Sequence, residues 1–203
     1  MGVSINTNDT ANNTFSAATD DGHNVLHINK QSTKTNTASG QNAKYTFGLD
    51  EATNASKVVM KFDILINSDG TAKSDKGTFN AYIFQNTDYA NTPYGGRLYT
   101  YTDGFTFGDT NATYNATVTN NQLGTYLLNY GEWYTVTLEI VTGGADEFSA
   151  TWYVGDQVYG TSTNYWGSAG TSNTTVNSLY LWVQGNPTLN ACIDNLTLTV
   201  YGK

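Results

Sequence analysis

The chain has 203 residues, of which only 13% are charged, and its formal net charge is −8. This length suits one β-sandwich or barrel and is short for two domains, so we expect a single domain over residues 1–203. The nine basic residues form no run or stripe, which disfavours nucleic acid and anionic membranes as partners. No apolar run approaches the ~20 residues of a membrane-spanning helix. The acidic, Asn/Thr-rich composition favours an extracellular bacterial protein.

Short strands separated by turn residues are predicted along the whole sequence. Thr, Asn, Gly, Tyr and Val are plentiful, good helix formers are scarce, and turn signals recur about every ten residues. This pattern predicts an all-β, antiparallel sandwich. The expected strands are Asn24–Ile28, Ala43–Gly48, Lys57–Ile66, Thr78–Gln85, Gly96–Thr102, Thr125–Leu128, Trp133–Val141, Glu147–Val154, Gln157–Thr161, Ser178–Gln184 and Ala191–Tyr201. Residues 67–76 and 106–124 are expected to form long loops.

The two histidines, His23 and His27, lie at and just before the first predicted strand. Their spacing of four places them on one face of a strand, and neither has a serine or cysteine motif beside it. No zinc-ligand spacing is present. We therefore expect both histidines to be surface or edge residues. The single cysteine, Cys192, is expected to be a small residue packed in a strand.

Two central strands show a clear apolar alternation. In Lys57–Ile66 the residues of even number from Val58 to Ile66 are expected to face a core, and in Trp133–Val141 the same holds from Tyr134 to Ile140. Lys61 and Asp63 then face outward. Trp133 is interpreted as a cap on the core edge, and Trp152 as core or edge packing.

Two further strands each carry aromatic and polar side chains on one face. In Gly96–Thr102 that face holds Arg97, Tyr99 and Tyr101, and in Ser178–Gln184 it holds Tyr180, Trp182 and Gln184. Aromatic rings stack on the apolar faces of sugars, while amide and guanidinium groups bind hydroxyls, so this composition favours carbohydrate. The structural alternative is that tyrosines stabilise the sheet as cross-strand pairs.

The segment 163–170, "TNYWGSAG", places Tyr165 and Trp166 in a predicted loop. The two rings either plug the open end of the sandwich or form an exposed platform for a ligand. Leaving a tryptophan in water forgoes up to a few kcal/mol of burial, so the platform requires a binding function to select for it.

A structural calcium ion is a further expectation. Simple alternation in "CIDNLTLTV" buries Asp194 with Leu196 and Leu198, and a buried carboxylate needs a counter-charge or several donors. Calcium supplies that charge, with Asp20 and Asp21 of "TDDG" as further ligands. The alternative is a bulge that turns Asp194 toward backbone amides.

Five segments in chain order carry a resemblance to a known family, namely "NVLHI", "KVVMKFDILI", "GEWYTVTLEI", "YVGDQVYG" and the closing "IDNLTLTVYG". In these segments the sequence resembles a bacterial carbohydrate-binding module of the concanavalin A-like, laminin-G-like jelly-roll type. The resemblance implies a ligand on the concave sheet, where Tyr180, Trp182, Gln184, Arg97, Tyr99 and Tyr101 are the candidates, or on a loop rim, where the candidates are Tyr94, Tyr165 and Trp166.

Enzymes share this fold, and their motifs are the test of a catalytic function. The laminarinase-type hydrolases carry Glu-x-Asp-x-x-Glu, and the alginate-type lyases carry a Gln-x-His strand and an Arg-rich strand; this sequence has none of them. Asp146 and Glu147 lie in a turn and make a poor acid–base pair. We therefore predict no enzyme but a module that binds a neutral polysaccharide such as starch or a hemicellulose, as a monomer within a larger secreted or cell-surface protein. A polysaccharide-degrading hydrolase or lyase, and a structural or adhesion domain, remain the alternatives.

Overall fold

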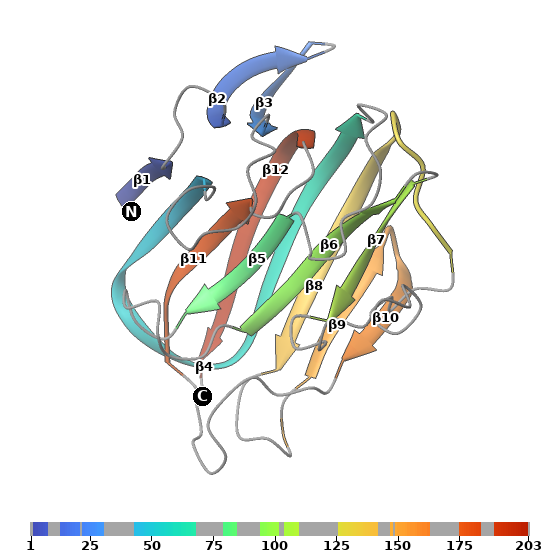
Figure 1. Cartoon of the computed structure of the whole chain (residues 1–203). Coiled ribbons are helices and arrows are strands. Elements are labelled where there is room, and N and C mark those ends of the chain that lie inside the picture. Colours follow the sequence, from blue (N-terminus) through green and yellow to red (C-terminus); the bar gives the residue numbers. More distant parts are fainter. Residues whose placement is uncertain are drawn as a thin grey trace, which may run out of the picture.

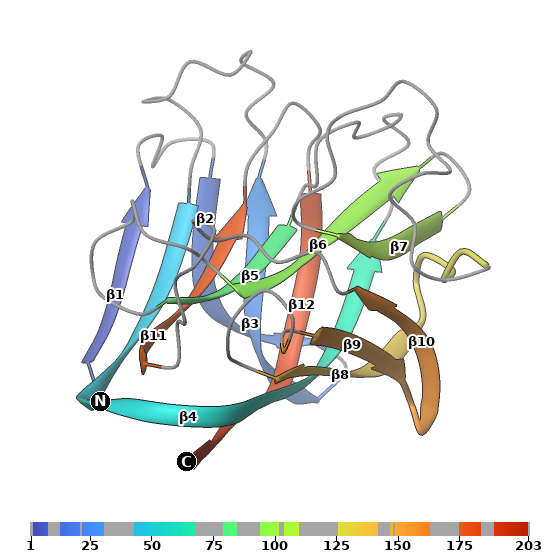
Figure 2. The same cartoon turned by 90° about the horizontal axis from the view of Figure 1, so that it is seen from below.

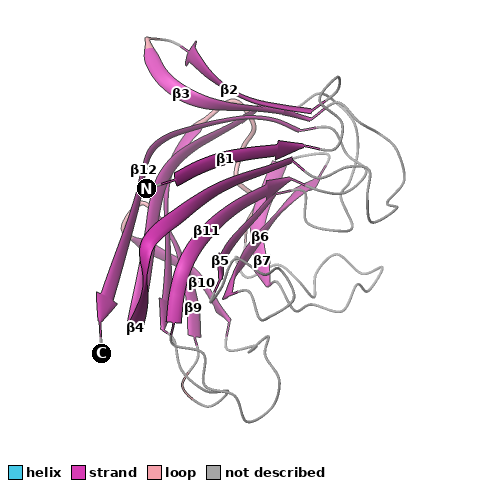
Figure 3. Cartoon of the chain, turned by 90° about the vertical axis from the view of Figure 1, so that its left-hand side faces the viewer, coloured by secondary structure: helices cyan, strands magenta, loops and turns pink. Residues whose placement is uncertain are grey.

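A computed structural model shows an all-strand protein (Figure 3). No helix long and apolar enough to cross a membrane occurs in the part of the chain that the structure describes. Backbone pairing is described throughout the strands, and side chains are described for a smaller set of residues. The described residues are 2–7, 13–20, 22–30, 43–67, 79–84, 94–101, 104–109, 126–141, 147, 149–162, 175–183 and 189–202.

The first antiparallel layer, sheet A, has the strand order β1–β4–β11–β5–β6–β7. Its strands are β1 (Gly2–Thr7), the first half of β4 (Ala43–Asn67), β11 (Thr175–Val183), β5 (Phe79–Phe84), β6 (Tyr94–Tyr101) and β7 (Gly104–Asp109).

The second layer, sheet B, has the order β2–β3–β12–β4–β8–β9–β10 and is also antiparallel. It consists of β2 (Asn13–Asp20), β3 (His23–Lys30), β12 (Leu189–Gly202), the second half of β4, β8 (Trp133–Val141), β9 (Ser149–Val154) and β10 (Gln157–Ser162).

Strand β4 belongs to both layers. Residues 43–48 pair with β1 and β11, whereas residues 57–67 pair with β12 or β8. Figure 2 shows this strand curving beneath both layers. One continuous strand therefore fixes the position of one sheet relative to the other.

The core lies between the sheets, with β5, β6 and β7 in front of β8, β9 and β12 in Figure 1. The predicted inward residues of β4, from Val58 to Ile66, are at most 1% exposed, and Val136, Leu138 and Ile140 of β8 are fully buried. Across the layers, the rings of Phe107 and Trp152 stack with centroids 4.4 Å apart. The predicted core face of both strands and the buried position of Trp152 are confirmed.

The edge strands β7 and β10 are joined by a buried phenol. The Tyr159 hydroxyl donates to the carbonyl oxygen of Tyr126 over 2.6 Å and lies 2.5 Å from the Thr106 hydroxyl. Burial raises the pKa of Tyr159 above its usual value near 10. Nearby, residue 104 must be glycine because a Cβ atom there would lie 2.4 Å from the Leu128 carbonyl oxygen.

The strand prediction is confirmed for the fold class and incomplete in detail. Strand β8 has the predicted bounds, while β1, β2 and β7 were not expected, and β7 occupies part of the predicted loop 106–124. The predicted strands 43–48 and 57–66 are one strand. The predicted strand 125–128 appears only as a single bridge between Phe105 and Leu128.

Candidate functional site

The register of sheet A separates an inner face from an outer face. Leu98 of β6 lies opposite Phe107 of β7, and Phe107 is buried against Trp152 of sheet B. Leu98 and Phe107 therefore occupy inner positions. Because successive strand positions alternate between faces, Arg97 occupies a position on the outer face.

A row of directly opposed positions crosses the outer face of sheet A. Lys44 of β4 lies opposite Trp182 of β11, Trp182 opposite Asn80 of β5, and Asn80 opposite Arg97 of β6. Opposed residues in an antiparallel pair share a face, with strands about 4.8 Å apart. We call these four positions the sheet A row. They come from four different strands, and of the neighbouring pairs in the row only β5 and β6 follow each other in the sequence.

Tyrosine positions flank the sheet A row on the same face. Tyr180 of β11 lies opposite Tyr82 of β5, and each lies two residues along its strand from Trp182 or Asn80. Tyr99 and Tyr101 continue the face of Arg97 along β6. The structure therefore brings five of the nine predicted carbohydrate-binding residues onto one face, namely Arg97, Tyr99, Tyr101, Tyr180 and Trp182.

The other four predicted binding residues are not part of this group. Tyr94 begins β6 opposite Ile83, which places it at an inner position, on the other face from Arg97. Tyr165, Trp166 and Gln184 lie outside the described residues. The choice between plug and platform for Tyr165 and Trp166 remains a prediction.

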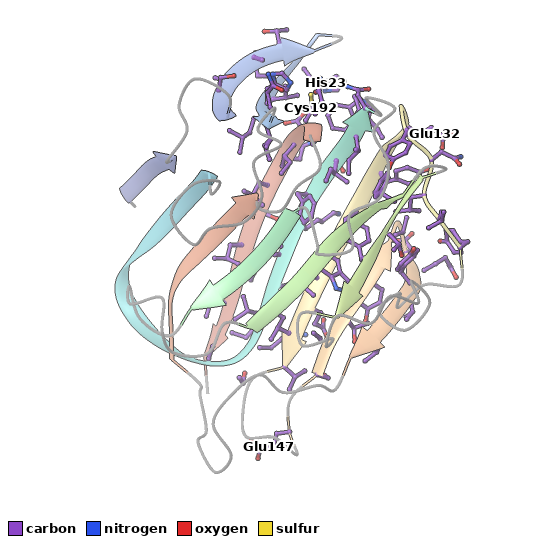
Figure 4. All side chains as sticks on the ribbon, viewed as in Figure 1. His23, Glu132, Glu147 and Cys192 are labelled. Carbon is purple, nitrogen blue, oxygen red and sulfur yellow. The ribbon has the colours of Figure 1, made fainter. Side chains whose placement is uncertain are left out.

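A cavity of about 260 Å³ lies on the outer face of sheet B. Its lining residues are His23, Asp63, Trp133, Tyr134, Thr135 and Asp194. Figure 4 shows His23 at one end of the sandwich, near Cys192, with Glu147 at the opposite end. Trp133 is 37% exposed, so its predicted role as a cap on the core edge is wrong. It pairs with Leu65, on the opposite face of β4 from the core residues.

The prediction that alternation buries Asp194 among leucines is also wrong. The register between β12 and β4 shifts between Asp194 and Thr197, and Asn195 adopts a positive φ of 51°. This one-residue bulge puts Asp194 opposite Asp63, on the outer face. The Asp194 carboxylate accepts the Asn195 N–H at 2.7 Å, as the bulge alternative predicted. Its other oxygen lies 3.2 Å from Nδ1 of His23.

Asn195 connects the two opposed carboxylates of the cavity. Its side-chain amide donates to Asp63 over 2.7 Å, and the Thr135 hydroxyl donates to the other Asp63 oxygen over 2.5 Å. Like charges directly opposite each other destabilise a sheet, so these neutral donors offset part of that repulsion.

The predicted calcium ion stays a prediction. Asp194 has partners within the chain, and no group of three His, Cys, Asp or Glu side chains suited to a metal occurs among the described residues. Asp20 is described only as a β2 position opposite His23, and Asp21 lies outside the described residues. A fall in melting temperature with excess chelator is the measurement that would support the ion.

Several candidate site residues were missed in the sequence. Lys44, Asn80 and Tyr82 belong to the outer face of sheet A, and the alternation in "AKYTFG" and "FNAYIF" was the available signal. The opposition of Asp63 and Asp194 has no such signal, because it depends on strand pairing and on the bulge.

The fold is similar to solved structures of enzymes that act on carbohydrates. A carbohydrate esterase from the Shiga toxin-encoding bacteriophage phi24B matches with a TM-score of 0.63 at 14% identity, over 99% of this chain and 91% of that one. An endo-β-1,4-glucuronan lyase from the fungus Trichoderma reesei matches with a TM-score of 0.62 at 10% identity, over 95% and 89%. Alginate lyase Aly36B matches with a TM-score of 0.61 at 13% identity, over 100% and 94%. No family model and no curated protein matches the chain.

These comparisons confirm the jelly-roll β-sandwich and correct the predicted class of function. The matched structures are mostly polysaccharide lyases, including a family 7 alginate lyase with bound substrate. They contradict the prediction of a non-catalytic module and the prediction that the chain is not an enzyme. The prediction rested on the absence of the motifs of two particular enzyme groups, and one fold can host many different functions.

Proposed function

We propose that the chain is a polysaccharide lyase that cleaves a uronate-containing polymer on the outer face of sheet A. The observation that carries the proposal is the sheet A row, which holds two cationic residues, Lys44 and Arg97, in register with Trp182. Tyrosine positions flank this row, and the fold is that of the lyases described above.

The chemistry of elimination accounts for these residue types. A base removes the proton on the carbon next to the uronate carboxylate, the bond from the adjacent carbon to the glycosidic oxygen breaks, and that oxygen takes up a proton. A carbon–carbon double bond forms in the sugar, and no water is consumed. Negative charge develops at the carboxylate, where a fixed cation stabilises the transition state. Arg97 suits this role because guanidinium binds a carboxylate through two parallel hydrogen bonds.

Proton transfer is assigned to tyrosine or lysine. The only two histidines of the chain lie on β3, in sheet B, and so are not on the sheet A row. The candidates on the outer face are the phenols of Tyr82, Tyr99 and Tyr180 and the amine of Lys44, all residue types that serve as general acids and bases. Trp182 is assigned to stacking on a sugar ring.

The same positions disfavour hydrolysis. Glycoside hydrolases use two carboxylic acids that flank the scissile bond. Neither the sheet A row nor the adjacent row through Tyr180 and Tyr82 contains Asp or Glu at its paired positions. Elimination is therefore the reaction that these residues support.

The test is incubation with alginate, glucuronan and, as the neutral comparison, a mixed-linkage β-glucan. We expect ultraviolet absorbance from an unsaturated uronate with at least one anionic polymer and none with the glucan. New reducing ends without that absorbance would establish a hydrolase and overturn the proposal. A polysaccharide substrate is met outside the cell, and the composition of the chain likewise favours an extracellular location.

A further inference from the structure

The cavity on the outer face of sheet B has a composition unlike that of the sheet A row. One wall is aromatic: the ring centroids of Trp133 and His23 lie 6.1 Å apart at 42°, and Trp133 is exposed. The floor is formed by Asp63, Thr135 and Asp194. Drug-sized ligands occupy cavities of roughly 300–1,000 Å³, so a cavity of about 260 Å³ has room for about one sugar ring.

The carboxylates of this cavity retain capacity to accept hydrogen bonds. Each oxygen of Asp63 has one described partner, Thr135 or Asn195, and each oxygen of Asp194 likewise has one, Asn195 or His23. A carboxylate oxygen can accept two hydrogen bonds. One further donor, such as a sugar hydroxyl, can therefore be bound at each oxygen.

We propose that this cavity binds one uncharged pyranose ring of a carbohydrate, as a second site separate from the sheet A row. The apolar face of the ring stacks on Trp133, and its hydroxyls donate to Asp63 and Asp194. Two carboxylates at the floor repel a uronate, so the cavity selects against the anionic units assigned to sheet A. This site goes beyond the proposed function and does not depend on catalysis.

The experiment is calorimetric titration of the full chain with cellohexaose, maltohexaose and xylohexaose, and with a mannuronate hexamer for comparison. We expect at least one neutral hexamer to bind, and we expect Trp133→Ala and Trp133→Leu each to weaken that binding about tenfold or more. The leucine variant retains apolar volume and keeps the test valid where the alanine variant fails to fold. Asp63→Asn is expected to weaken binding of the same hexamer, because an amide offers one acceptor oxygen in place of two.

The matched control is Tyr201→Ala. Tyr201 is 47% exposed, pairs with Lys57 on the same face of sheet B, and lies seven residues along β12 from Asp194, roughly 20 Å away. Its loss is expected to leave binding unchanged. The proposal is overturned if no neutral hexamer binds, if both Trp133 variants bind the hexamer as tightly as the unaltered chain, or if the mannuronate hexamer binds through Trp133 more tightly than the neutral ones. Because the readout is heat of binding, absence of lyase activity leaves this test intact.

Discussion

The two candidate sites on the outer faces of the sandwich differ in charge, although the faces share one core and one long strand. Lys44 and Arg97 occupy positions on the outer face of sheet A, whereas Asp63 and Asp194 line the cavity of sheet B. A net charge of −8 therefore describes neither site. The sequence-based preference for neutral polymers relied on that net value, and the different charges of the two sites show why a local arrangement has to be known first.

The largest expected effect concerns the core that holds the two faces apart. Trp152→Ala removes a side chain that is 2% exposed and stacked on Phe107, so we expect it to lower the free energy of unfolding by about 3–5 kcal/mol. Urea denaturation measures this change. The control is Tyr153→Ala on the same strand, a partly buried residue whose loss is expected to cost clearly less. Equal losses would mean that Phe107 and Trp152 do not join the sheets.

The next effect tests the cationic face. Arg97→Ala is expected to lower kcat/KM for a uronate polymer by about 10²–10³-fold, the usual cost of removing a group that stabilises transition-state charge. The rate of unsaturated-product formation measures it. Lys61→Ala is the matched control, because it removes one positive charge from an exposed position on sheet B. Equal rates for the two variants would exclude Arg97 from the site.

The bulge at the acidic face has a smaller effect. Asn195→Gly keeps the positive φ without strain and loses only the amide hydrogen bond to Asp63, so we expect a loss of stability of about 1 kcal/mol. Asn195→Ala adds the cost of a left-handed backbone, about 1–2 kcal/mol. Thermal denaturation of both variants separates the two contributions. If alanine costs no more than glycine, the backbone conformation is not what holds the carboxylates in place.

The smallest effect concerns the phenol between the sheet edges. Since burial raises the pKa of Tyr159, folded Tyr159 keeps its proton while the unfolded residue ionises, so stability falls as pH rises above about 10. Tyr159→Phe is expected to cost about 1 kcal/mol at neutral pH and to make the alkaline loss less steep. Urea denaturation from pH 7 to 11 measures both. Tyr201→Phe, at an exposed position, is expected to leave the stability at neutral pH unchanged.

Alternation along single strands was enough to predict the fold class and most of the core. Apolar residues recur at every second position over Val58 to Ile66 and over Val136 to Ile140, and this set is buried. Such an alternation predicts a half-buried strand. Strand β2 is rich in Thr, Ser and Ala and carries little of that signal, and β1 is short, with only Val3 and Ile5 as large apolar residues. Strand β7, "GFTFGD", is short and bounded by glycine, which is typical of a turn.

The candidate site could be predicted only in part, because it depends on pairing between strands. The faces of Arg97 and Trp182 follow from alternation within their own strands. Their position in one row with Lys44 and Asn80 follows from register, which a single strand does not specify. Asp194 shows the same limit, because one extra residue in β12 reverses the face that alternation assigns to it.

The continuity of β4 has a consequence for how this protein can be divided. Lys44, near the start of the strand, lies in the sheet A row, and Asp63, near its end, lies at the floor of the sheet B cavity. A fragment that carries one face without the other must be cut within this strand, which removes backbone pairing from both layers. We therefore expect that neither face can be produced in folded form without the other.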